Sequence, residues 1–105
     1  MRKAVSHLGF FDQIQGAQRL VHTLVAMRDE TKCRAFLEDI CTIKELQDIA
    51  QRLEVAYMLD EGKNYQEISK STGASTATIS RVKKCLVYGS GGYRYALDGS
   101  KGEAK

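Results

Sequence analysis

The chain is 105 residues long with a net charge of +3, and it contains three cysteines and no proline. This length allows one small domain, which often needs oligomerisation because it buries a limited share of its surface. An odd number of cysteines without a CxxC pair argues against a disulfide framework or a zinc site, so we expect reduced thiols. The lack of an apolar run of about eighteen residues argues against a membrane span. We therefore expect a cytoplasmic protein.

The predicted elements are all helices, because Leu, Ala, Glu, Lys, Arg and Gln dominate the first ninety or so residues and no strand-like alternation occurs. The first helical segment is FFDQIQGAQRLVHTLVAMRD, residues 10–29. Five of its apolar side chains recur at spacings of three and four: Phe10, Ile14, Ala17, Val21 and Leu24. Further apolar residues widen this face beyond what so short a chain can cover. We therefore interpret it as a subunit interface; an ordinary core helix of a monomer is the alternative.

The next two helices are delimited by capping residues. Asp29 or Thr31 is a suitable N-cap for the second helix. Thr42 caps the third, with Glu45 at the N3 position completing a capping box, and Gly62 ends it as a C′ glycine. The apolar residues between them keep a helical period for about five turns, which predicts one long helix.

Two shorter helices and a tail follow. A capping box at Asn64 starts a helix that stops at Gly73, and Ser75 or Thr76 starts another that runs to about Tyr88. The remaining stretch holds five glycines, so we expect a tail that is partly ordered at most, with local docking of YRYAL. The chain thus divides into an N-terminal arm, a helical dimerisation core, a helix-turn-helix and a Gly-rich tail, at residues 1–9, 10–62, 63–88 and 89–105.

The two helices around Gly73 have the lengths and the spacing of a helix-turn-helix. The stretch STGASTATISRVKK, residues 71–84, carries their turn and most of the second helix. Ile68 falls where the first helix meets the core, and Ile79 and Val82 fall where the second helix packs back against it. The opposite surface of the second helix is therefore free for a partner.

This outer surface suits DNA. Thr76, Ala77 and Ser80 are short, which lets the helix backbone approach base edges in the major groove. Residues 62–88 hold five cations and one anion, whereas residues 28–61 hold five cations and nine anions. The cations available for phosphates are Lys63, Lys70, Arg81, Lys83 and Lys84. Ser75 and Gln66 complete the candidate DNA-binding set; an ordinary helical hairpin with a solvated basic helix is the alternative.

From about Phe10 to Leu97 the chain resembles the Trp repressor superfamily, in particular its YerC/YecD-type branch. The resemblance is most specific across CTIKELQDIAQRLEVAYML and TGASTATISRVKKCL. It implies an intertwined, all-helical homodimer in which the first three helices of both subunits form one core and two helix-turn-helix units project from it. Two recognition helices roughly 34 Å apart would read a near-palindromic operator.

The resemblance also implies roles for individual residues. The three short residues of the second helix match the base-facing positions of the family. Gln66 and Ser69 match positions where the Trp repressor proper has cations near the DNA backbone, so these phosphate contacts are altered here. Lys83 and Lys84 are the residues that can replace them.

The Trp repressor proper holds tryptophan between two arginines, and the matching pocket positions are Thr42, Arg52, Thr78 and Arg81. Val82 replaces a glycine that lies against the indole ring, and Cys85 replaces a serine that faces the ligand's amino group. Valine fills volume that the indole needs, and a thiol is a weaker hydrogen-bond partner than a hydroxyl. We expect that L-tryptophan is not the effector, while another small-molecule corepressor stays open. Arg52 can instead be an exposed helix cation, and Arg81 a DNA phosphate contact.

These patterns lead to one leading hypothesis, a homodimeric transcriptional regulator, and more narrowly a repressor, that binds duplex DNA. The alternative is a protein-interaction module of the same shape that docks an acidic partner. The sequence shows no phosphate-cradling glycine loop, nucleophile elbow or paired-carboxylate arrangement. We therefore expect no enzymatic activity, no metal and no cofactor.

Overall fold

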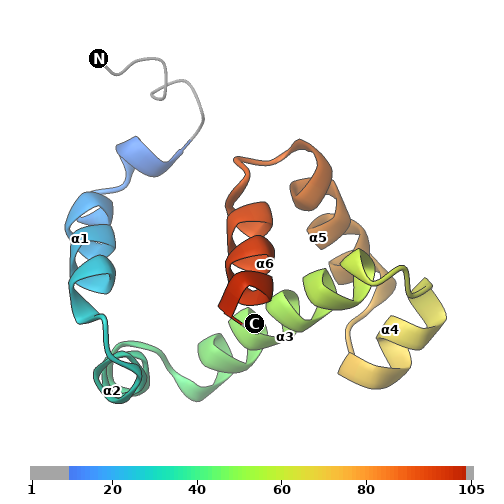
Figure 1. The fold of residues 1–105 in the computed structure, drawn as a ribbon, viewed down its shortest axis with the longest axis horizontal. Coiled ribbons are helices and arrows are strands. Elements are labelled where there is room, and N and C mark those ends of the chain that lie inside the picture. Colours follow the sequence, from blue (N-terminus) through green and yellow to red (C-terminus); the bar gives the residue numbers. More distant parts are fainter. Residues whose placement is uncertain (1–9, 104–105) are drawn as a thin grey trace. The chain divides into compact units, whose positions relative to one another are not determined.

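The computed structural model describes residues 10–103, with side chains described through residue 100. The N-terminal arm expected at residues 1–9 lies outside this part. The described residues form a short 3₁₀ helix, η2 (Phe11–Gln13), and six α-helices (Figure 1). These are α1 (Ala17–Met27), α2 (Glu30–Ile40), α3 (Ile43–Asp60), α4 (Tyr65–Thr72), α5 (Thr76–Tyr88) and α6 (Gly92–Glu103). This part of the chain contains no strand, which confirms the all-α class. None of its helices combines the length and the apolar character needed to cross a membrane.

The chain divides into two compact units between Ile43 and Lys44. In the N-terminal unit, η2 and α2 pack against α1. The single helical segment expected from residue 10 onward is interrupted, because Ile14 is extended and Gly16 adopts a left-handed backbone with φ of +86°. The helix proper therefore begins at Ala17, and α2 follows with Asp29 as its N-cap, whose side chain accepts from the Lys32 N–H at 3.3 Å.

The apolar side chains of the N-terminal unit are largely in contact with solvent. Ala17 is the one buried residue among those described in this unit. Phe10 is 72% exposed and Val25 is 65% exposed. Six further large apolar side chains of this unit are also exposed: Phe11, Ile14, Leu20, Val21, Leu24 and Ile40. The helical periodicity is thus present without a partner surface among the described residues of the N-terminal unit.

The C-terminal unit contains a closed apolar core. Buried side chains from α3, α4, the following turn and α5 form one cluster: Val55, Ala56, Ile68, Ala74, Ile79 and Val82. The inward positions predicted for Ile68, Ile79 and Val82 are confirmed, since each is fully buried. This core fixes α4 and α5 relative to α3.

The end of α3 is a left-handed turn at Gly62, which has φ of +85°. The Gly62 N–H donates to the Leu59 carbonyl at 3.0 Å, and the Lys63 N–H donates to the Met58 carbonyl at 3.1 Å. These two hydrogen bonds form a Schellman motif, which satisfies carbonyls that the helix end would otherwise leave open. The turn leads directly into α4.

The C-terminal tail differs from its sequence-based expectation, because residues 92–103 form the helix α6. Leu97 is fully buried, and Arg94 Nη2 lies 2.9 Å from Asp60 Oδ1 at the end of α3. Arg94 Nε also lies 3.4 Å from Asp98 Oδ1 on α6 itself. The glycines lower helix propensity by about 1 kcal/mol each, but burial of Leu97 against the rest of the unit offsets this cost.

Candidate nucleic-acid interface

The helix α4 is positioned by reciprocal hydrogen bonds at its start. Asn64 Oδ1 accepts from the Glu67 N–H at 2.9 Å, and Glu67 Oε1 accepts from the Asn64 N–H at 2.9 Å. This is the predicted capping box. At the other end Gly73 has φ of +78°, and an added Cβ there would meet no atom closer than 3.9 Å. Glycine is thus required by backbone conformation rather than by space.

Side-chain hydroxyls hold the turn between α4 and α5. Ser69 Oγ donates to the Ala74 carbonyl at 2.9 Å, and the Ala74 N–H donates to Thr72 Oγ1 at 3.1 Å. Gln51 Nε2 on α3 donates to the Thr72 carbonyl at 3.1 Å. No sequence signal marked Gln51, because its partner lies 21 residues away. The turn is therefore tied both to itself and to α3.

Ser75 is the N-cap of α5, which confirms the first of the two predicted alternatives, Ser75 and Thr76. Its Oγ accepts from the Thr78 N–H at 3.1 Å and lies 3.2 Å from Thr78 Oγ1. These bonds use the hydroxyls of Ser75 and Thr78 locally. The hydroxyls of Thr76 and Ser80, one turn apart on the same helix, lie on exposed residues.

All of the predicted DNA-contacting residues are exposed. This group comprises Lys63, Gln66, Lys70, Ser75, Thr76, Ala77, Ser80, Arg81, Lys83 and Lys84. The buried Ile79 and Val82 hold the opposite side of α5 against the core. A helix fixed by one fully buried side therefore presents its other side to solvent.

The structure brings three of these residues together at a hollow between α4 and the start of α5. It has a volume of about 350 Å³, and Gln66, Lys70 and Thr76 line it with Tyr65 and Ser69. The hollow thus joins Lys70, a predicted phosphate contact on α4, to Thr76, a predicted base contact on α5.

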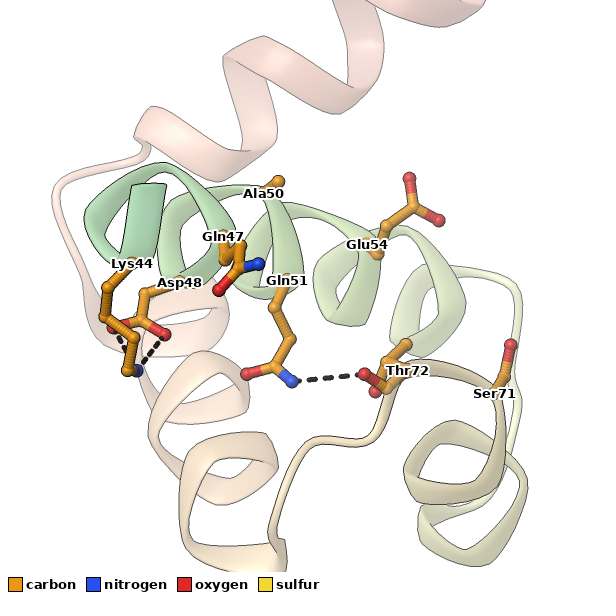
Figure 2. Close-up of a pocket in the computed structure, with 8 residues that line it drawn as sticks. All are labelled: Lys44, Gln47, Asp48, Ala50, Gln51, Glu54, Ser71 and Thr72. Carbon is orange, nitrogen blue, oxygen red and sulfur yellow. Dashed lines mark hydrogen bonds and ion pairs between the residues drawn. The ribbon is translucent and has the colours of Figure 1, made fainter. Parts of the chain in front are cut away.

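A larger hollow, of about 630 Å³, lies between α3 and the end of α4 (Figure 2). Most of its lining residues are polar, and two pairs interact: Lys44 Nζ lies 2.7 Å from Asp48 Oδ1, and Gln51 reaches Thr72 as described above. None of the residues predicted for an effector pocket lines either hollow.

The predicted effector-pocket residues occupy several environments. Val82 is fully buried in the core. Thr42 lies between α2 and α3, and Thr78 is partly buried beside its hydrogen-bond partner Ser75. The exposed Arg52, Arg81 and Cys85 come from α3 and α5, and all three influence the ionisation of one side chain to which the sequence gave no role in the pocket.

That side chain is Tyr93 on α6. Burial raises the pKa of its phenol, and the charge of Cys85 raises it further, whereas Arg52 and Arg81 lower it. The net direction is upward. Three of the six predicted pocket residues, Arg52, Arg81 and Cys85, therefore influence the ionisation of Tyr93.

Residues 15–101 match the sequence profile of the Trp repressor protein family. The chain belongs to the Trp repressor family. It is 51% identical over 89 residues to the uncharacterised protein YerC of Bacillus subtilis (strain 168), an alignment that covers 83% of this chain and 86% of YerC. Family membership points to a DNA-binding regulator rather than to an enzyme.

Two solved structures share the fold of this family member. A TrpR-like protein from Eubacterium eligens ATCC 27750 has a TM-score of 0.79 and 40% identity, covering 85% of this chain and 92% of its own. A candidate Trp repressor from Staphylococcus aureus has a TM-score of 0.79 and 34% identity, covering 95% of this chain and 96% of its own. The helical arrangement is thus that of Trp repressor-like proteins.

Proposed function

We propose that the protein is a homodimeric, sequence-specific DNA-binding repressor that inserts α5 into the major groove. The observation that carries this proposal is the two-sided character of α5. Ile79 and Val82 are fully buried on one side, and short side chains followed by cations are exposed on the other.

The first half of the exposed side supports base reading. Thr76, Ala77 and Ser80 are short and exposed, so the helix backbone can approach base edges closely. The hydroxyls can bond to bases, and the methyl groups of Thr76 and Ala77 can contact thymine methyl groups. These three residues therefore provide discrimination among operators.

The cations support backbone binding. Lys63, Lys70 and Arg81 are exposed together with Lys83 and Lys84. None of these five takes part in an ion pair with another residue of the described part of the chain. Free cations release DNA counterions on binding, so we expect affinity to fall steeply with salt.

The exposed apolar face of the N-terminal unit supports a homodimer. Phe10, Val25 and the neighbouring apolar residues are not covered by the described residues of the N-terminal unit, and soluble proteins rarely leave large apolar patches open. A second copy offers the same patch, as a two-fold interface requires. Two copies of α5 related by that two-fold axis suit a near-palindromic operator.

L-Tryptophan is not the effector in this proposal. The position that needs a small residue against the indole is occupied by Val82, which is fully buried in the core. Opening space there would require the core to separate, which close-packed interiors resist. A thermal melt tests this: millimolar L-tryptophan should leave the Tm unchanged, and a dose-dependent rise would contradict the proposal.

Selection of bound duplexes from a random pool, followed by gel shifts with two variants, tests the DNA-reading face. Lys84→Ala should weaken binding to all duplexes alike and reduce the salt slope by about 0.9 for each lost contact, about 1.8 for a dimer. Ser80→Ala should change the preference among operators instead. Lys44→Ala is the control, since this exposed lysine is paired with Asp48 on α3, and it should leave the slope unchanged.

Two outcomes would contradict the proposal. If both α5 variants bind selected and random duplexes as the wild type does, the DNA-reading face lies elsewhere. If the pool yields no preferred site, the protein-interaction alternative with an acidic partner is favoured.

A further inference from the structure

Tyr93 is held against the core by the helix that carries it. It packs against the cluster that contains Val55, Ala56 and Val82. Leu97, one turn further along α6, is fully buried on the same helical face. Arg94 ties the intervening turn to Asp60 at the end of α3. The packing of Tyr93 against the cluster is thus supported by two further contacts of the same helix.

The two helices opposite Tyr93 bring polar groups to the margin of this cluster. On α3, Arg52 precedes the buried Val55 and Ala56 by three and four residues. On α5, Cys85 follows the buried Val82 by three residues. Residues at these spacings share a helical face, so both polar residues flank the surface on which the phenol lies.

Electrostatic coupling agrees with this placement. Cys85, Arg52 and Arg81 all act on the ionisation of Tyr93. A phenol ring between two helices that each contribute a guanidinium group is an arrangement in which cation–π and hydrogen-bonding contacts are both available. Arg52 on α3 and Arg81 on α5 are the residues that can supply such contacts to an aromatic ring at this place.

We propose that Tyr93 is a built-in occupant of the site between α3 and α5, so that the chain supplies the aromatic ring that this site holds. The site would then accept a phenol-like ring once the Tyr93 side chain is removed, and it would exclude free aromatic amino acids while Tyr93 is in place. The proposal deepens the proposed function and rests on it only for the consequence for DNA binding.

The short connection to α5 makes the internal ring a strong competitor. Three residues, Gly89, Ser90 and Gly91, separate α5 from α6. A group tethered by a short linker has an effective concentration in the millimolar range or above. The anchoring of α6 by Leu97 and Arg94 strengthens this preference further. A free ligand would have to displace the ring and its helix together.

The consequence for the proposed regulator is binding without an added effector. In a site filled by Tyr93, the face of α5 that contains Val82 and Cys85 is supported in every molecule. The DNA-reading face on the neighbouring side of α5 is then held in place at all times. DNA affinity would depend on Tyr93 rather than on the concentration of a small molecule.

The test uses p-cresol, which reproduces the phenol side chain, in thermal melts of the full chain. Tyr93→Ala should have a lower Tm than the wild type, and p-cresol should raise it in a saturable manner by about 5 °C. The wild type should not respond to p-cresol. Tyr95→Ala is the matched control, because Tyr95 lies on the same helix and is 80% exposed; this variant should keep its Tm and not respond. Absence of a saturable response in Tyr93→Ala, or an equal response in the wild type, would overturn the proposal.

A second measurement needs no variant and covers the case in which Tyr93→Ala does not fold. Nuclear Overhauser contacts between the Tyr93 ring protons and the side-chain methylenes of Arg52 and Arg81 should be present in the wild type. Their absence would overturn the proposal.

Gel shifts then separate this proposal from the proposed function. Wild-type protein should bind duplex DNA without added ligand, and p-cresol should restore the weakened binding of Tyr93→Ala. If the wild type did not bind duplex DNA, the proposed function would be contradicted. The thermal melts and the nuclear Overhauser contacts would still decide whether Tyr93 occupies the site.

Discussion

Burial of Leu97 makes α6 a structural part of the C-terminal unit, and Leu97→Ala tests this directly. The side chain is fully buried, so truncation removes all of its contacts and leaves a cavity. Buried Leu→Ala changes cost about 2.7–5.0 kcal/mol, and the lower values belong to sites that can collapse. Because α6 is the last described helix, it can shift to close part of the cavity. We expect the free energy of unfolding to fall by about 3 kcal/mol.

Urea unfolding followed by circular dichroism gives this value, provided that the protomer concentration is the same for all variants. Tyr95→Ala serves as the control. Tyr95 is 80% exposed two residues earlier on α6, so its loss should change stability by less than about 0.5 kcal/mol. If Leu97→Ala cost less than about 1 kcal/mol, α6 would not be packed in solution and the reasoning for Tyr93 would lose its anchor.

Three further predictions follow from local geometry. Gly89→Ala should lower stability by about 1–3 kcal/mol in thermal melts, because an added Cβ would collide with a carbonyl oxygen of α5. Gly92→Ala is the control, since a Cβ there meets open space and should not destabilise the protein. Equal Tm values for the two variants would contradict this prediction. Asn64→Ala should cost about 1 kcal/mol in urea unfolding through loss of the capping box, and an unchanged midpoint would count against that box. Arg52→Gln should raise the pKa of Tyr93 in an NMR titration, because the guanidinium favours the phenolate; a lowered or unchanged pKa would contradict its placement.

Local signals in the sequence located most helix ends. Gly62 and Gly73 adopt the left-handed backbone expected of them, and Asn64 and Ser75 cap the helices that follow. These features involve residues within four or five positions of one another, so backbone sterics and short-range hydrogen bonds decide them. Such features can be read without knowledge of the fold.

Periodicity alone was insufficient near Gly16. The apolar spacing continues across this residue, yet the backbone turns left-handed there and α1 begins one residue later. A glycine costs about 1 kcal/mol relative to alanine only when the helix continues through it, and this cost alone does not decide whether the helix is interrupted. Its actual conformation depends on the contacts of the flanking residues.

The sequence predicts the candidate DNA-reading face. The structure supports this prediction because all of the predicted DNA-contacting side chains are exposed. The same sequence carried no sign of the hollow that joins Gln66, Lys70 and Thr76, since these side chains converge only when α4 packs beside α5. It also gave no sign of Gln51, whose hydrogen bond to Thr72 spans 21 residues.

The sequence by itself determined the helical class, the main caps and the two-sided pattern of α5, because all of these depend on neighbours along the chain. Only tertiary contacts make the glycine-rich tail a helix and place Tyr93 against the core of the C-terminal unit. Burial of Leu97 and the ion pair between Arg94 and Asp60, 34 residues apart, outweigh the low helix propensity of that segment. Packing energies of this kind exist only after distant helices have met, which is why composition pointed to a loose tail.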